Sequence, residues 1–247
     1  MKEFSIDINC DVGEGIGNES ELLPLISSCN IACGGHAGDI SSITEVVKLA
    51  KLHKVKIGAH PSYPDKANFG REIMNIPYSK LKESLKDQLK TFEDVLQQEK
   101  AKFSHIKAHG ALYNQTAKDS ELAFHYLEVI QQYKDFASLY VPYGSKIAKQ
   151  ALDAGFKIMY EAFGDRNYTD NLSLVSRKHD NALIQNPQKV LKHILSIIKE
   201  GKVITNSGRK IEIHAETICI HGDTSSALEI LMYLSNELPN HSVQLQK

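Results

Sequence analysis

Short β-prone runs alternate along this chain with longer segments that have the apolar periodicity of helices. Seven runs are rich in β-branched and aromatic residues and short enough to be buried strands, namely Phe4–Asn9, Asn30–Cys33, Val55–Ala59, Ser104–Ala108, Ser138–Val141, Lys157–Tyr160 and Thr217–Ile220. Parallel strands need long connections, usually helices, because each strand must start again at the same end of the sheet. The alternation therefore predicts an α/β fold with a parallel sheet, either closed into a barrel or open and doubly wound.

Apolar residues recur at helical spacing between the runs, and the clearest stripe is Leu81, Leu85, Leu89, Phe92 and Leu96. Hydrophobic residues make up 42% of the 247 positions and charged residues 24%, which is close to the soluble globular average and sufficient for a sizeable core. No Pro- or Ser-rich linker divides the chain, so residues 1–247 are predicted to form one domain. The segment Val203–Ile213, centred on Asn206-Ser207-Gly208, predicts a peripheral β-hairpin.

The charge balance and the cysteine content exclude several classes of partner. With 29 Lys and Arg against 30 Asp and Glu, the chain has no basic footprint for nucleic acid or for an anionic membrane. No apolar run approaches the roughly 20 residues of a membrane span, and the first residues lack the apolar core of a signal peptide. Four cysteines, Cys10, Cys29, Cys33 and Cys219, are too few for a disulfide scaffold. We therefore predict a cytoplasmic protein with reduced thiols.

Ionisable side chains follow six of the seven predicted strands, where α/β enzymes place their active sites. They are Asp11 and Glu14, His36, His60, Lys107 and His109, then Glu161, Asp165 and Arg166, and finally His221 and Asp223. Any one histidine of this kind is more often structural than functional, but their shared position favours a common site if the sheet closes. Asp39, by contrast, precedes Ile40-Ser41-Ser42 and is interpreted as a helix N-cap.

Two long connections and several missing motifs refine this hypothesis. The loops Pro61–Pro77 and Ala162–Pro187 are long enough to be lids, and their arginines, Arg71, Arg166 and Arg177, suit carboxylate or phosphate recognition or are simply solvated charges. There is no GxxxxGK[ST] motif, and the glycines that follow Asp11 lack the last position of the dinucleotide fingerprint. A metal site made of Asp11, His36 and His60 stays open, although no HExxH motif supports it and no metal is firmly predicted.

Several long motifs carry a resemblance to a known family: DINCDVGEG, NIACGGHAGD, IGAHPSYPD, FGRE, HIKAHGALYN, EAFGDRNY, LVSR and ICIHGD. Through them the chain resembles, from Asp7 to about Asp223, the LamB/YcsF family of bacterial 5-oxoprolinase A subunits. It departs from the family at Gly164, where alanine is usual, and in Asp170–Arg177, which lacks an expected glycine.

The resemblance implies a distorted seven-stranded parallel β/α barrel, similar to glycoside hydrolase and deacetylase barrels. It also implies ATP-dependent hydrolysis of the lactam 5-oxo-L-proline to L-glutamate, together with partner subunits B and C. Because the chain has no P-loop, ATP as cosubstrate is expected to bind wholly or partly to those partners. The catalytic positions predicted in this way are Asp11, Glu14, His36, His60, Lys107, His109, Glu161, Asp165, His221 and Asp223, and substrate contacts are predicted for Asn9, Asn30, Arg71, Tyr113 and Arg166.

Ring opening needs a base, an acid and cations for the developing charge. We expect Asp11 or Glu161 to orient or deprotonate water, His109 or His60 to act as the acid, and Lys107 with Arg166 to hold anionic oxygens. Two alternatives remain, a stand-alone metal-dependent amidohydrolase of the deacetylase kind and a non-catalytic scaffold subunit. Cys10 and Cys219, at the ends of the first and last predicted barrel strands, are expected to approach each other and stay reduced.

Overall fold

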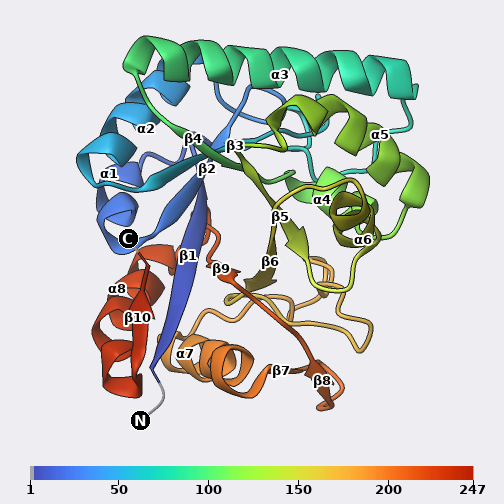
Figure 1. The fold of residues 1–247 in the computed structure, drawn as a ribbon. Helices are drawn as coiled ribbons and strands as arrows, with labels where there is room; N and C mark the ends of the chain where they lie inside the picture. The colour runs from blue at the N-terminus through green and yellow to red at the C-terminus, as the bar shows by residue number, and fades with distance from the viewer. Residues whose placement is uncertain (1–2, 247) are drawn as a thin grey trace.

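The computed structural model describes residues 3–246, and its central feature is a parallel barrel (Figure 1). The main sheet has the strand order β10-β1-β2-β3-β4-β5-β6-β9, and pairing of β9 with β1 closes the last seven strands on themselves. The barrel strands are β1 (Phe4–Val12), β2 (Ser28–Ala32), β3 (Lys56–His60), β4 (Phe103–Ile106), β5 (Ser138–Pro142), β6 (Ile158–Phe163) and β9 (Thr217–Cys219). All seven predicted runs are strands, and the predicted barrel is confirmed.

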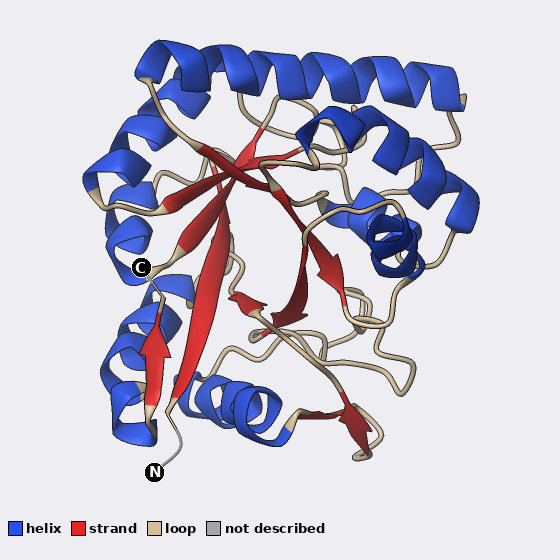
Figure 2. Cartoon of the chain, in the orientation of Figure 1, coloured by secondary structure: helices blue, strands red, loops and turns tan. Residues whose placement is uncertain are grey.

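Helices surround the barrel and cover its outer face (Figure 2). The α-helices are α1 (Glu19–Leu22), α2 (Ile40–Leu52), α3 (Tyr78–Glu99), α4 (Gly110–Thr116), α5 (Ser120–Ile130), α6 (Lys146–Asp153), α7 (Pro187–Leu195) and α8 (Ala227–Glu237). Short helical segments are η1 (Leu23–Leu25), η2 (Gln131–Tyr133), η3 (Ser196–Glu200, a π-helix) and η4 (Pro239–His241). The predicted stripe is buried along α3, and Asp39 caps α2 by accepting a hydrogen bond from the backbone N–H of Ser42.

Two small features lie outside the barrel. The predicted hairpin forms from β7 (Lys202–Ile204) and β8 (Lys210–Glu212), which pair antiparallel. The strand β10 (Val243–Leu245) pairs parallel with the start of β1 and was not predicted, because three residues after a helix carry too little pattern. Among residues 3–246, no helix is long and apolar enough to cross a membrane.

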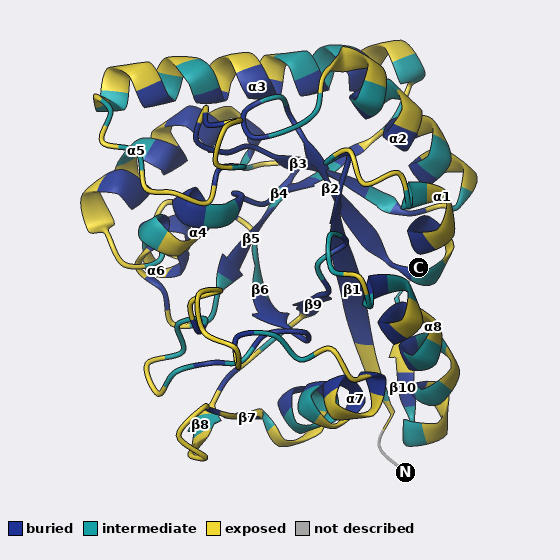
Figure 3. Cartoon of the chain, turned by 180° about the vertical axis from the view of Figure 1, so that it is seen from behind, coloured by how far each residue is buried: buried dark blue, intermediate teal, exposed yellow. Residues whose placement is uncertain are grey.

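The interior of this barrel is polar, although branched aliphatic side chains fill most β/α barrels. Side chains alternate along β1, so that Ile6, Ile8 and Cys10 face the helices while Asp7, Asn9 and Asp11 face the interior. The inward residues are buried and hydrogen-bond to side chains of other strands; Asp7 accepts from Ser28 of β2 and from Thr217 of β9. Figure 3 shows that most residues of the barrel strands are buried. Stability here rests on a hydrogen-bonded polar network inside an apolar shell.

The middle layer of the interior depends on one glycine. Gly58 of β3 pairs with His105 of β4, and a Cβ at position 58 would lie 2.2 Å from His105 Nε2. The ring of His105 occupies that space, stacks on Tyr140 with ring centroids 4.1 Å apart, and donates a 2.8 Å hydrogen bond to Asn30 Oδ1. Burial lowers the pKa of His105 to about 3, so the ring is neutral.

Candidate active site

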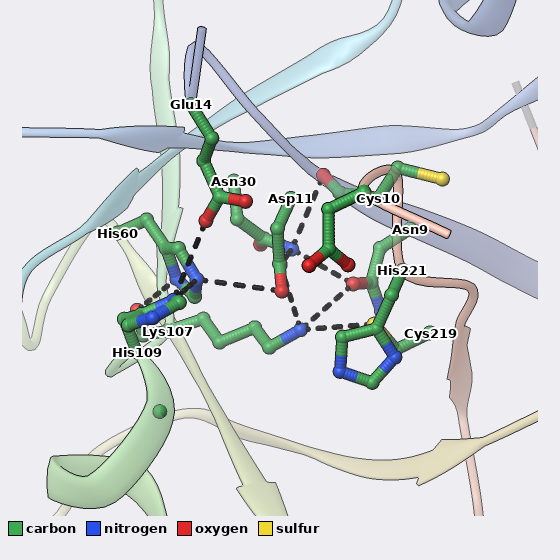
Figure 4. Close-up of polar contacts among 12 residues, drawn as sticks. Asn9, Cys10, Asp11, Glu14, Asn30, His60, Lys107, His109, Cys219 and His221 are labelled. Atoms are coloured by element: carbon green, nitrogen blue, oxygen red, sulfur yellow. Dashed lines mark hydrogen bonds and ion pairs between the residues drawn. The ribbon is translucent and has the colours of Figure 1, made fainter. Parts of the chain in front are cut away.

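A buried lysine lies at the centre of the barrel mouth, where the strands end (Figure 4). Lys107 Nζ lies 2.9 Å from Asp11 Oδ1 and 2.9 Å from Glu161 Oε1, and it also donates to Cys219 Sγ at 3.1 Å and to Asn9 Oδ1 at 3.3 Å. Burial alone would lower the pKa of Lys107, but Asp11 and its other neighbours hold it well above the usual range. An ammonium has three donors, so four acceptors use all of them.

Amide side chains that lie deeper in the barrel hold the carboxylate of Asp11 in place. Asn30 Nδ2 donates to Asp11 Oδ1 and to Asn9 Oδ1, both at 2.8 Å, and Asn9 Nδ2 donates to Glu161 Oε1 at 2.9 Å. Although burial opposes ionisation, His60 and Lys107 hold the pKa of Asp11 well below its usual range. Asp11 is therefore an ionised, rigidly held carboxylate.

Three histidines and Glu14 form a second group beside Asp11. His60 Nδ1 donates to the Lys107 carbonyl at 2.8 Å, and His109 Nε2 donates to the Phe69 carbonyl at 2.9 Å. His36 stacks on His109 with ring centroids 3.6 Å apart, and its Nε2 donates to Glu14 Oε1 at 2.9 Å. Burial lowers the pKa of His36 and of His109, so both rings are neutral.

Two glycines bring this histidine group together. Gly70 in the loop after β3 has φ of +61°, and Gly110 at the start of α4 has φ of +55°. A Cβ on Gly110 would lie 2.6 Å from the Gly70 carbonyl oxygen, and a Cβ on Gly70 would lie 2.9 Å from His36 Cβ. Only glycine permits both the left-handed backbone and this close approach.

An aspartate and a histidine form a third group on the opposite wall. His221 Nδ1 lies 3.0 Å from both carboxylate oxygens of Asp165, which also accepts the His221 backbone N–H at 3.1 Å. Burial opposes ionisation of Asp165, but pairing with His221 lowers its pKa. The arrangement fixes the proton on Nδ1 and leaves Nε2 free to exchange a proton, as in an orienting carboxylate–histidine pair.

These groups open onto a cavity of about 410 Å³ with a cationic rim. Arg71 and Arg177, one from each long loop, both pair with Asp223, the second at 3.8 Å. Arg166 instead donates to the carbonyls of Val175 and Ala182, at 2.6 and 3.3 Å, and so holds its own loop closed on itself. The cavity is large enough for a small organic anion.

The structure brings most of the predicted site residues together. Nine of the predicted catalytic positions lie at the mouth: Asp11, Glu14, His36, His60, Lys107, His109, Glu161, Asp165 and His221. Asp223 lies instead at the rim, because both loop arginines draw it there. Of the predicted substrate contacts, Arg71, Tyr113 and Arg166 line the cavity.

Some predicted contacts fall elsewhere, and some residues of the site were not predicted. Asn9 and Asn30 are fully buried below the cavity rather than lining it, since their amides are used within the interior network. Two residues of the site were missed: Cys219 accepts a hydrogen bond from Lys107, and His105 donates one to Asn30. Polar residues alternate in the motif DINCD, and this alternation could have indicated a layer of polar side chains inside the barrel. Cys10 is in register with Cys29, whereas Cys219 opposes Asn9, so Cys10 and Cys219 occupy opposite faces of the sheet. All four cysteines are free.

Comparison with known proteins gives full-length matches. The model of the LamB/YcsF family matches residues 6–247. The chain is 37% identical over 247 residues to the 5-oxoprolinase A subunit of Bacillus cereus (strain Q1), covering 98% of each protein. It is also 37% identical over 249 residues to the 5-oxoprolinase A subunit of Staphylococcus haemolyticus (strain JCSC1435), again covering 98% of each.

Among solved structures, the lactam utilization protein of Thermus thermophilus superposes with a TM-score of 0.90 at 31% identity, covering 98% of this chain and 99% of that one. A GH113 β-1,4-mannanase superposes with a TM-score of 0.50 at 11% identity, covering 89% and 88%, and shares the fold alone. The expected similarity to glycoside hydrolase barrels is thereby confirmed at the level of architecture.

Proposed function

This chain belongs to the LamB/YcsF family, and from that premise we propose that it is the A subunit of a 5-oxoprolinase, which takes part in opening the lactam 5-oxo-L-proline to L-glutamate. Full-length identity to curated proteins of that name supports the proposal. One structural observation carries the proposal. His221, which is hydrogen-bonded to Asp165 and can transfer protons, lines the same cavity as the arginines of the rim.

Lactam hydrolysis adds the oxygen of water to the carbonyl carbon, breaks the ring C–N bond and places a proton on the leaving nitrogen. An unstrained amide carbonyl is a weak electrophile, so ATP as cosubstrate supplies the activation by phosphorylating the carbonyl oxygen and leaving as ADP. Addition of water and breakage of the C–N bond then leave an acyl phosphate, and a second water hydrolyses it to the carboxylate and inorganic phosphate. The relatives are named as A subunits, which implies an assembly with other subunits. We propose subunits B and C as the partners, and we propose that they provide all or part of the ATP-binding site. We keep the cytoplasm as the proposed compartment, since all four thiols are free.

We assign proton transfer to His221. Its Nδ1 is held by Asp165, which leaves Nε2 to take a proton from water and return it to the leaving nitrogen. His60 and His109, the acids expected from the sequence, each use one ring nitrogen on a backbone carbonyl, and their other ring nitrogens lie 2.9 Å from each other, so we do not assign the acid to them. The Glu161 Oε2 atom is buried without a hydrogen-bond partner among the described residues, and it is the group we propose to orient the attacking water.

The remaining predicted roles shift to positioning and binding. The donors of Lys107 are used by Asp11, Glu161 and their neighbours, so we propose that it fixes these carboxylates rather than binding the substrate. The substrate carboxylate is assigned to Arg71 and Arg177, whose guanidinium groups keep free donors at the rim.

Reconstitution tests this function. The chain is mixed with candidate subunits B and C, ATP and 5-oxoproline, and glutamate is followed. His221→Asn is expected to lower kcat at least about a hundredfold, the usual contribution of a general acid–base. The matched control is His214→Asn, because His214 is exposed and lies outside the cavity. Failure of the wild-type mixture to form glutamate contradicts the function, while full activity of His221→Asn contradicts only its role.

A further inference from the structure

Two imidazole rings in the barrel mouth, those of His60 and His109, contact each other through one nitrogen of each ring. His60 Nδ1 and His109 Nε2 each donate to a backbone carbonyl, which can only accept. An imidazole with one hydrogen has a lone pair on its other nitrogen, so with one hydrogen on each ring both His60 Nε2 and His109 Nδ1 carry lone pairs. These two nitrogens lie 2.9 Å apart. His60 Nε2 also lies 3.4 Å from Asp11 Oδ2. Lone pairs that face each other at this distance repel, and a proton or a metal ion beside both atoms removes the repulsion.

The adjacent carboxylate, that of Glu14, is also buried without a lysine or arginine partner among residues 3–246. The side chain of Glu14 is 4% exposed, yet its ion-pair partners within residues 3–246 are imidazoles and include no lysine or arginine. Burial of an uncompensated carboxylate is costly. Its Oε1 atom lies 3.4 Å from His109 Nδ1, so the three groups present their electron pairs to one place.

The spacing of these atoms suits coordination. Ligand atoms of Glu14, His60 and His109 all lie within 4.8 Å of one another, with contacts of 2.9 and 3.4 Å. Metal–nitrogen bonds of about 2.1 Å place tetrahedral ligand atoms roughly 3.4 Å apart. The rings of His60 and His109 are perpendicular, at 90°, so both lone pairs can point at one ion in the ring planes.

His36 belongs to this group in a different capacity. Its ring is parallel to that of His109, at 3° with centroids 3.6 Å apart. Two parallel rings at that separation cannot both direct in-plane lone pairs at one ion. His36 instead donates Nε2–H to Glu14 Oε1, which is how outer-shell groups orient a ligating carboxylate.

We propose that Glu14, His60 and His109 bind a divalent transition metal ion of the zinc class, with His36 as a positioning residue. Two histidines and one carboxylate form a ligand set of known catalytic zinc sites, and both histidines have the backbone-carbonyl partners typical of metal ligands. The set differs from the one considered from the sequence, since Glu14 and His109 replace Asp11 and His36. The proposal goes beyond the proposed function, because it concerns the isolated chain without 5-oxoproline or ATP.

The test is metal binding by the purified chain after removal of metals with a chelator. Titration with Zn²⁺ is followed by calorimetry and elemental analysis, and Co²⁺ serves as a spectroscopic substitute. We expect one equivalent of either ion, with a visible Co²⁺ absorption of four- or five-coordinate type. His60→Gln and Glu14→Gln are each expected to weaken binding more than about tenfold, the lower limit for loss of even an outer-shell partner. His214→Gln, which removes an exposed imidazole, is the matched control and keeps wild-type affinity.

The metal-binding results for the wild-type chain and the two ligand variants decide whether the site exists. Stoichiometric binding that falls in both ligand variants supports the site. Absence of binding to the wild-type chain overturns it, and so does equal binding by wild-type and both variants, since the ion then sits elsewhere. Circular dichroism of each variant checks folding; if one variant does not fold, the other, together with the wild-type stoichiometry, still decides. A proton shared by His60 and His109 is the competing explanation, and it predicts no metal uptake.

Discussion

At the scale of single residues, one buried charge organises the mouth of the barrel. Lys107 has two carboxylates, Asp11 and Glu161, each 2.9 Å from its ammonium group. The Coulombic attraction offsets the desolvation of all three groups only while the set is complete. Position at a strand end was enough to single out Lys107 from the sequence, but the sharing of its donors among four acceptors was not, because those acceptors come from β1, β6 and β9.

Replacing Lys107 by Met is expected to lower the free energy of unfolding by about 3–5 kcal/mol at pH 7.5, since two buried carboxylates then lack their cation. The pKa of Asp11, which Lys107 helps to hold low, rises in the variant, so the deficit shrinks as the pH falls and this carboxylate takes up a proton. Urea unfolding at pH 7.5 and pH 5.5 measures both effects. The control is Lys149→Met on exposed α6 surface, expected within about 0.5 kcal/mol of wild type. A Lys107→Met protein as stable as wild type would contradict the argument.

The buried ring of His105 predicts a pH dependence of stability. Burial lowers its pKa to about 3 in the folded chain, whereas an unfolded histidine has a pKa of about 6.5. Between these values the unfolded state binds a proton that the folded state does not. The contribution to stability is therefore complete above pH 6.5 and declines as the pH falls, by about 1.4 kcal/mol per pH unit for one proton.

The free energy of unfolding should fall less steeply between pH 6 and pH 4 in His105→Asn than in wild type. The difference in slope should correspond to the uptake of close to one proton on unfolding, while His214→Asn keeps the wild-type slope. Denaturant unfolding across this pH range measures the slopes, which are compared rather than the absolute stabilities. Equal slopes for wild type and His105→Asn would show that the ring is not held neutral.

At the scale of elements, depth along a strand decides what a polar residue does. Asn9 precedes Asp11 by two residues on β1, which places it about 6–7 Å deeper in the barrel. Both were predicted at the site, yet only Asp11 reaches the cavity. The sequence indicates which strand a residue belongs to, whereas its depth depends on register with β2 and β9, which are set by distant segments.

The two long loops meet through Asp223, and this junction predicts how substrate is recognised. Arg71→Gln is expected to raise KM for 5-oxoproline about tenfold in the reconstituted enzyme, with a smaller change in kcat, because a charge-assisted bond to the substrate carboxylate is lost. Unfolding free energy should change by less than about 1 kcal/mol, as for a half-exposed ion pair. Arg209→Gln on the peripheral hairpin is the control.

A lactam that lacks the carboxylate separates recognition from chemistry. With this substrate, wild type and Arg71→Gln should have the same kcat/KM, since the arginine then has no partner to lose. An equal defect on both substrates would place Arg71 in the chemistry rather than at the rim.

At the scale of the whole molecule, closure of the sheet creates the site. The alternation of seven runs predicted parallel strands but left a barrel and an open sheet equally possible, because the deciding contact joins β1 to β9, more than two hundred residues apart in sequence. Pairs such as Asp7 with Thr217 close the ring and bring Asp165 and His221 within reach of Asp11 and Lys107. In an open sheet these groups would lie at separate strand ends.

The closed barrel also predicts what the chain cannot do alone. Its sequence contains no GxxxxGK[ST] motif, and the cation at the cavity floor, Lys107, is already neutralised by Asp11 and Glu161. Neither feature offers a cradle for a triphosphate. The isolated chain is therefore expected to bind 5-oxoproline weakly, with a Kd near the millimolar range or about 4 kcal/mol, and to form no glutamate with or without ATP.

Calorimetry with 5-oxoproline measures the binding, and a coupled glutamate assay measures turnover, both on the chain without partners. Heat of binding that disappears in Arg71→Gln, together with absent turnover, would agree with a substrate-holding subunit that depends on its partners for activation. ATP-dependent turnover by the lone chain would reveal a nucleotide site within the barrel and contradict the division of labour. Turnover without ATP would instead favour the stand-alone amidohydrolase, because a pocket that opens an unstrained lactam unaided must supply all the activation itself.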